Sequence, residues 1–85
     1  MTEEQSGRVR RVVRVEGRVQ GVGYRVNARR EAERLGIEAN PVNLDDGAVR
    51  IEVAGPREAV EAFVAWCHAG PRLAEVSRVT VSEKS

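Results

Sequence analysis

The alternation of apolar and polar positions along the chain predicts four strands. From Arg8 to Val15, valines of one parity alternate with positions that are mostly arginine, which predicts a strand with one apolar and one solvated face. A weaker pattern from Ile37 to Leu44 contains Pro41, which restricts this strand to the edge of a sheet. The clearest strand is expected from Ala48 to Ala54. A last strand, before a polar tail, is marked by Leu73, Val76, Val79 and Val81.

Two other segments repeat their apolar positions every three or four residues, as amphipathic helices do. The first helix is expected to begin at Tyr24 and to end at Gly36. The second is expected between Pro56, a favoured helix start, and Gly70. The residues predicted to be buried are Tyr24, Ala28, Ala32 and Leu35 in the first helix and Ala59, Val60, Phe63, Trp66 and Cys67 in the second.

The resulting order, β-α-β-β-α-β, predicts a ferredoxin-like α+β sandwich in which two helices cover one face of an antiparallel sheet. We expect one domain spanning residues 1–85, with flexible ends at about 1–7 and 83–85. In this topology the third strand lies between the first two, which run parallel and therefore end at the same edge. The segment after the first strand and Asn43, near the end of the second, should meet there.

Composition narrows the range of partners. The formal net charge is only +1, so we expect no nucleic acid and no anionic membrane as partner. Aromatic residues make up 4% of the chain, too few for the stacking platforms of RNA-binding sheets. Cys67, the single cysteine, allows neither an internal disulfide nor, with His68 alone beside it, a four-ligand metal site. We expect a monomer. We expect it in the cytoplasm, because the start MTEEQSGR is unlike a secretory signal and no apolar run approaches the roughly 20 residues of a membrane span.

The segment VEGRVQGVGYRV, residues 15–26, carries the candidate chemistry. Gly17, Gly21 and Gly23 allow positive φ, so that successive N–H groups can form a concave anion-binding nest ahead of a helix. Arg25, in the first helical turn, adds a planar donor fork suited to phosphate. A cation there opposes the helix dipole, at about 0.3 to 1 kcal/mol, unless an anion compensates. From the residues alone the alternative stays open that the glycines only turn the chain and Arg25 is solvated.

Two motifs resemble those of a known family. GRVQGVGYR, residues 17–25, resembles the signature of the acylphosphatases, and VNLDDG, residues 42–47, resembles their second motif, in the same order and spacing. The resemblance implies hydrolysis of a small-molecule acyl phosphate to a carboxylate and inorganic phosphate, without metal or cofactor. It implies catalytic roles for Arg25 and for Asn43, which would orient the attacking water. The residues it implies in phosphate binding are Gln20, Gly21, Val22, Gly23, Tyr24 and Arg25.

The chain departs from the family pattern at a few positions. Asn27 stands where an aromatic residue is common, which is expected to thin the core below the glycine segment, and residues 39–41 (Ala39, Asn40 and Pro41) replace a glycine and an aromatic residue. A rival interpretation is a non-catalytic ferredoxin-like module that binds phosphate or another anion with the same nest. Asp45 and Asp46, beside Gly47, are explained by a tight hairpin turn rather than by paired-carboxylate chemistry.

Overall fold

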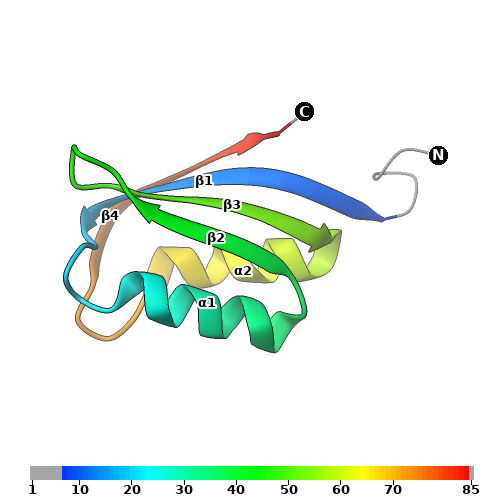
Figure 1. Ribbon diagram of the computed structural model, residues 1–85, viewed down its shortest axis with the longest axis horizontal. Helices are drawn as coiled ribbons and strands as arrows, with labels where there is room; N and C mark the ends of the chain where they lie inside the picture. The colour runs from blue at the N-terminus through cyan, green and yellow to red at the C-terminus, as the bar shows by residue number, and fades with distance from the viewer. Residues whose placement is uncertain (1–6, 85) are drawn as a thin grey trace.

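The elements of the fold follow the predicted order. The computed structural model describes residues 7–84, so of the ends expected to be flexible, about 1–7 and 83–85, residues 1–6 and 85 lie outside the described residues. Its elements are β1 (Arg8–Arg18), α1 (Tyr24–Leu35), β2 (Glu38–Asn43), β3 (Val49–Pro56), α2 (Arg57–Ala69) and β4 (Glu75–Glu83). The strands form one antiparallel sheet of order β2-β3-β1-β4, and both helices cover the same face of it (Figure 1). This is the predicted ferredoxin-like α+β sandwich.

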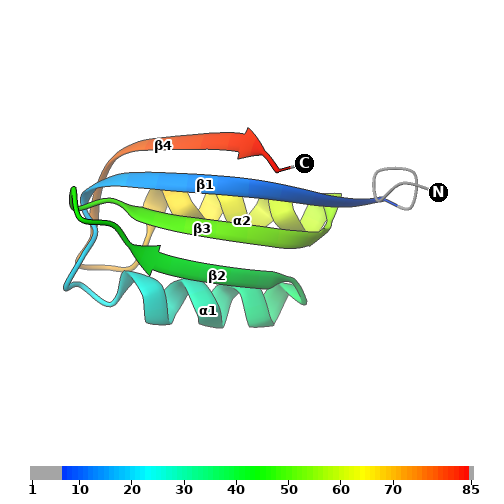
Figure 2. The ribbon, with the colours of Figure 1, turned by 45° about the horizontal axis from the view of Figure 1, so that its top comes forward.

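The position of β3 brings the ends of β1 and β2 together. β3 is antiparallel to both neighbours, so β1 and β2 run parallel, with β2 at the sheet edge as Pro41 requires. Val49, the first residue of β3, pairs with Val15 of β1 on one side and with Asn43 of β2 on the other. As a result, the connection from β1 to α1 and the hairpin turn after β2 lie at the same end of the sheet (Figure 2).

The core lies between the sheet and the two helices. Alternate residues of β1 and β3 face the helices and are buried, and the apolar faces of α1 and α2 pack against them. The buried residues include Val9, Val13, Val15, Val49, Ile51, Val53, Ala28, Ala32, Val60, Phe63 and Cys67. Tyr24 is 1% exposed, and its hydroxyl donates a 2.7 Å hydrogen bond to the backbone carbonyl of Cys67. Burial raises the pKa of the Cys67 thiol to about 12, which is typical of an inert core cysteine.

Several sequence-based strand boundaries differ from the structure, by one or two residues in β2 and β3 and in more consequential ways in β1 and β4. β1 continues to Arg18, beyond the predicted end at Val15. β4 includes Ser82 and Glu83, which were assigned to the polar tail, because their backbones pair with Val12 and Arg11 of β1. Leu73 was wrongly placed on the last strand: it is 70% exposed and lies in a turn in which the Ala74 amide donates to the carbonyl of Pro71.

Gly17 has a different role from the one predicted. The register between β1 and β4 shifts between Glu16 and Gly17, where φ is 122°. A Cβ atom at Gly17 would lie 2.2 Å from the backbone oxygen of Glu75. Gly17 therefore permits the close approach of β4 at a β-bulge, instead of shaping the anion-binding nest.

The departures in β2 leave its pairing intact. All six residues of the strand pair with β3, and Pro41 packs its ring into the core opposite Ile51. A proline fits here because an edge strand leaves half of its backbone amides without a sheet partner.

Candidate active site

The connection from β1 to α1 ends in two left-handed glycines. Gly21 has φ 75° and Gly23 has φ 80°, a region that side chains of other residues disfavour. A Cβ atom at Gly21 would meet nothing within 4 Å, so the backbone angle, and not the available space, requires glycine there. Gly23 is the N-cap of α1 and provides no side chain to cap the helix. The first amides of α1 are therefore left to another acceptor.

A small cavity opens at this helix start. It has a volume of about 110 Å³ and is lined by Val19, Gly21, Gly23, Tyr24, Arg25, Val26 and Asn43. Arg25 and Asn43 thus meet at one cavity, as the strand order led us to expect. Gln20 and Val22 do not line it: Val22 packs against the core, and the side chain of Gln20 points to the β2–β3 turn.

Two larger cavities lie away from this helix start. One of them, about 290 Å³, is lined by residues of β1, β2 and β3 together with Lys84. Two of its charged residues pair with each other, the ammonium of Lys84 with the carboxylate of Glu52, which also pairs with Arg50 outside the cavity. The second, about 210 Å³, lies between β1 and α2 and is mainly apolar. Neither is lined by the glycine segment ahead of α1 or by Asn43.

The polar groups at the small cavity are available to a ligand. Within residues 7–84, the side chains of Arg25 and Asn43 make no hydrogen bond or ion pair, and both are exposed. The first turn of α1 contains no acidic residue to offset the helix dipole or the charge of Arg25. The cavity therefore carries an uncompensated positive charge next to a free carboxamide.

Asn27, which was expected to thin the core below the glycine segment, forms hydrogen bonds at the start of α1. Its backbone amide and its side-chain Nδ2 both donate to the carbonyl oxygen of Gly23, at 3.1 and 2.8 Å. These bonds hold the first turn of α1 against its N-cap and leave the amides of that turn unblocked. Below the cavity, Val19 is 1% exposed. The ring of Tyr24 packs against that of Trp66, with 5.3 Å between the two ring centroids.

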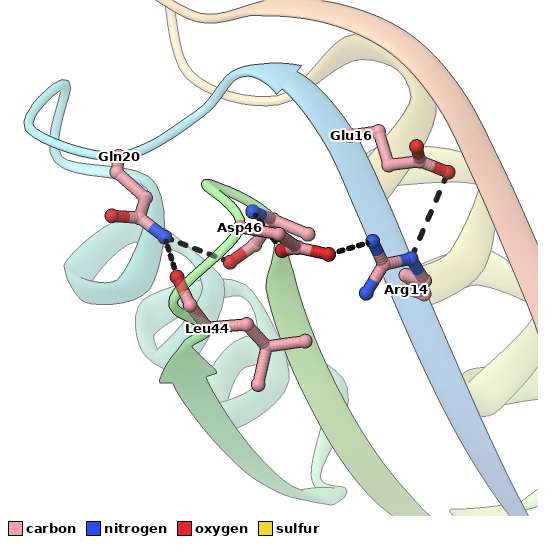
Figure 3. A network of polar contacts seen from close by, with 6 residues as sticks. Arg14, Glu16, Gln20, Leu44 and Asp46 are labelled. Atoms are coloured by element: carbon pink, nitrogen blue, oxygen red, sulfur yellow. Dashed lines mark hydrogen bonds and ion pairs between the residues drawn. The ribbon is translucent and has the colours of Figure 1, made fainter.

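A polar network supports the turn that follows Asn43 (Figure 3). The carboxylate of Asp46 accepts a 3.0 Å hydrogen bond from the amide of Ala48 and pairs with the guanidinium of Arg14 on β1. This hydrogen bond from Arg14 lowers the pKa of the Asp46 carboxyl. From the loop ahead of α1, Gln20 donates to two carbonyls of the same turn. The sequence indicates the turn itself, but neither of these two contacts.

The described part of the chain contains neither a metal cluster nor a membrane span. Across residues 7–84, no three or more histidine, cysteine, aspartate or glutamate side chains gather as metal ligands would. In the same range, both helices are too short or too polar to cross a bilayer.

Comparison with known proteins assigns the family. The acylphosphatase family profile matches residues 11–85. A protein named acylphosphatase from Azoarcus sp. (strain BH72) is 46% identical over 83 residues, which cover 98% of this chain and 85% of the relative. Another, from Thiobacillus denitrificans, is 54% identical over 71 residues, which cover 84% of this chain and 80% of the relative. The solved structure of an acylphosphatase from Coxiella burnetii superposes with a TM-score of 0.92 at 33% identity, covering 100% of this chain and 90% of that one. With two sequence motifs, the fold and these relatives in agreement, the chain belongs to the acylphosphatase family.

Proposed function

We propose that this protein hydrolyses acyl phosphates to a carboxylate and inorganic phosphate at the cavity that begins α1. The observation that carries the proposal is the meeting of Arg25 and Asn43, eighteen positions apart in the chain, at a helix start that has no acidic residue and no side-chain cap. Membership of the acylphosphatase family supports the reaction class.

The phosphoryl group binds at the positive end of α1 in this proposal. The amides around Gly21 and Gly23 and the guanidinium of Arg25 supply donors to its equatorial oxygens. Phosphoryl transfer depends chiefly on positioning and on stabilising charge on those oxygens, which preorganised donors provide. The dianion also compensates the charge of Arg25, so that substrate binding relieves an unfavourable interaction with the helix dipole.

Asn43 orients the attacking water. A carboxamide is too weak a base to remove a proton, but its oxygen accepts a hydrogen bond from water and its nitrogen can donate to substrate. A phosphate oxygen of the substrate takes the proton as the P–O bond to the acyl group breaks and the new P–O bond forms. The leaving carboxylate is weakly basic, which agrees with a cavity lined by no histidine, aspartate or glutamate.

We propose a cytoplasmic monomer acting on a free small molecule. All seven lining residues come from the β1–α1 connection, the first turns of α1 and the end of β2. The reaction as proposed calls for no metal or cofactor, because the amides and Arg25 neutralise the developing charge.

Phosphate release tests the proposal. Wild type, Arg25→Ala and Asn43→Ala are assayed with benzoyl phosphate and acetyl phosphate in excess chelator. Arg29→Ala is the matched control, since Arg29 is an exposed arginine of the same helix outside the cavity. We expect turnover by wild type and by the control, with large losses in both cavity variants. Asn43→Ala should retain affinity for inorganic phosphate, whereas a simple binding module would show no turnover in any variant. Equal rates for wild type and Arg25→Ala would refute the proposal.

A further inference from the structure

The side chain of Gln20 connects the loop that begins the cavity to the hairpin that carries Asn43 (Figure 3). Its Nε2 donates to the carbonyl oxygens of Leu44 at 2.8 Å and Ala48 at 2.9 Å. These residues close the β2–β3 hairpin, because the amide of Leu44 donates to the carbonyl of Ala48 at 2.8 Å. The side chain therefore spans two segments more than twenty residues apart, and the contact is partly buried.

The partners of Gln20 fix how its amide is oriented. A carbonyl oxygen only accepts hydrogen bonds, so the nitrogen of the side chain, and not its oxygen, must face the turn. The two N–H groups of Nε2 are matched by two acceptors. No residue of similar length other than glutamine supplies two neutral donors from one atom at this position.

The two carbonyls flank the catalytic candidate on the hairpin. Leu44 directly follows Asn43, and Ala48 directly precedes Val49, the residue that pairs with Asn43. Among the described residues, the Asn43 side chain has no hydrogen bond of its own, so its place depends on the backbone that carries it. β2 is an edge strand, paired on one side only, and Asn43 is its last residue. Hydrogen bonds that anchor this end of β2 therefore control where the carboxamide lies relative to the loop.

We propose that Gln20 is a positioning residue: its side chain fastens the β2–β3 turn to the loop ahead of α1 and so holds the Asn43 carboxamide at the distance from the phosphoryl site that in-line attack by water requires. The inference rests on the proposed function of the cavity. Gln20 acts through Asn43 and does not line the cavity. Displacement of a reacting group by about 1 Å can reduce a rate by 10²-fold, so a single tether at this position is sufficient to govern turnover.

Arg14 and Asp46 form a second, weaker brace on the same turn. Their ion pair joins β1 to the turn from the solvent side, where 37% of the Arg14 and 54% of the Asp46 side chain are exposed. Ion pairs this exposed contribute little. Gln20 makes neutral hydrogen bonds in a partly buried site, so its loss leaves two carbonyls each short of one partner.

Two substitutions distinguish the effect of the hydrogen-bond donors of Gln20 from the effect of its side-chain size. Gln20→Met keeps the length of the side chain and removes both donors. Gln20→Glu is isosteric but directs carboxylate oxygens at the two carbonyls, which repels the turn. We expect kcat for acyl phosphate hydrolysis to fall roughly tenfold to hundredfold in Gln20→Met, and further in Gln20→Glu. The inhibition constant for inorganic phosphate should change by less than about threefold, because the amides and Arg25 that hold phosphate remain.

A double-mutant cycle with Asn43→Ala tests whether Gln20 acts through Asn43. In the Asn43→Ala background, Gln20→Met should lower kcat by less than about twofold, since the group that it positions is gone. Full additivity of the two losses would overturn the proposal, and so would a loss of phosphate affinity equal to the loss in kcat. A kcat in Gln20→Met equal to that of wild type would also overturn it.

Amide hydrogen exchange gives a readout independent of catalysis. Gln20→Met should speed exchange at the amides of Leu44 and Gly47, which are both donors within the turn, and leave exchange in α2 unchanged. Unchanged exchange at Leu44 would refute the tether. If wild type releases no phosphate from any acyl phosphate, the proposed function fails whatever the variants do. If wild type turns over and the cycle is additive, only the role of Gln20 fails.

Discussion

The two helices of this protein start in contrasting ways, although they lie side by side under one sheet (Figure 1). α2 starts at Pro56 with ordinary backbone angles, has Glu58 in its first turn, and directs the amide of Arg57 to the carbonyl of Gly7 at 2.8 Å. α1 starts at a left-handed glycine, has no acid in its first turn, and places Arg25 where an acid would be favourable. The start of α2 also lacks a side-chain cap and contains Arg57, but Glu58 and the carbonyl of Gly7 compensate it in part within the fold. The start of α1 is suited to an anion from outside, and it is there that Asn43 lies.

Among the changes that test this comparison, removal of the cation at the start of α1 should have the largest effect. Arg25→Ala should reduce acyl phosphate hydrolysis by 10²- to 10³-fold, about 2.7 to 4 kcal/mol, the range found for loss of one preorganised donor. Without phosphate, the same variant should unfold at a temperature equal to or above that of wild type, because Arg25 opposes the dipole of α1. Initial rates and thermal unfolding of the same samples check both effects. A variant that loses activity and stability together would place Arg25 in the fold instead of the site.

The left-handed start of α1 offers the next largest effect. Gly23→Ala should lower the free energy of unfolding by about 1 to 2 kcal/mol, because the φ of 80° strains any residue with a Cβ atom. Pro56→Ala is the matched change at α2, where φ is −57° and alanine fits, so it should lower the free energy by less than about 1 kcal/mol. Urea unfolding of both variants measures the difference. Equal costs would show that the backbone at the start of α1 is not strained.

The acid of α2 should support stability without affecting catalysis. Glu58→Gln removes the negative charge from the first turn and should lower the free energy of unfolding by about 0.3 to 1 kcal/mol at low ionic strength, with the rate of phosphate release unchanged. The cost should shrink in 1 M salt, because an exposed charge is screened. A fall in activity would show that the two helix starts are coupled.

The smallest expected effect is a pH dependence at the turn beside α1. The hydrogen bond from Arg14 lowers the pKa of Asp46. The stabilisation that follows is present above the usual carboxyl range and is lost as pH falls through the lowered value, below about pH 4. Asp46→Asn keeps an oxygen for the amide of Ala48 but lacks the charge. The difference in free energy of unfolding between wild type and this variant, measured with urea, should therefore be larger at pH 7 than near pH 3. A difference independent of pH would rule out this ion pair.

The regular spacing of apolar residues predicted the fold, because a strand or helix that buries one face needs apolar residues at the positions on that face. The valines of β1 and the stripes of α1 and α2 follow such periods, and most of these residues are buried as predicted. Leu35, Ala59 and Trp66, which were also predicted to be buried, lie at the margin of the core and are only partly buried. Leu73 belongs to no period, and its apolar character was misleading, since a single exposed leucine is ordinary. The ends of β1 and β4 depend on backbone pairing with each other, which side-chain patterns do not encode.

The site was predictable only in part, for a similar reason. Strand order placed the glycine segment beside Asn43, and the cavity brings Arg25 and Asn43 together. Gly17 was misassigned because the role of a glycine depends on what approaches it, here the backbone of Glu75. The contacts of Gln20 were missed because its partners are backbone carbonyls 24 and 28 positions away, and every residue carries a carbonyl.

An NMR titration of the ¹⁵N-labelled protein with inorganic phosphate tests the central claim most directly. If α1 begins at a phosphoryl site, the amides of Gly21 to Arg25 and the side-chain amide of Asn43 should shift together and saturate, while the first amides of α2 remain still. In Arg25→Ala the same additions should produce little change. Shifts scattered over the surface without saturation, or confined to the start of α2, would contradict the account.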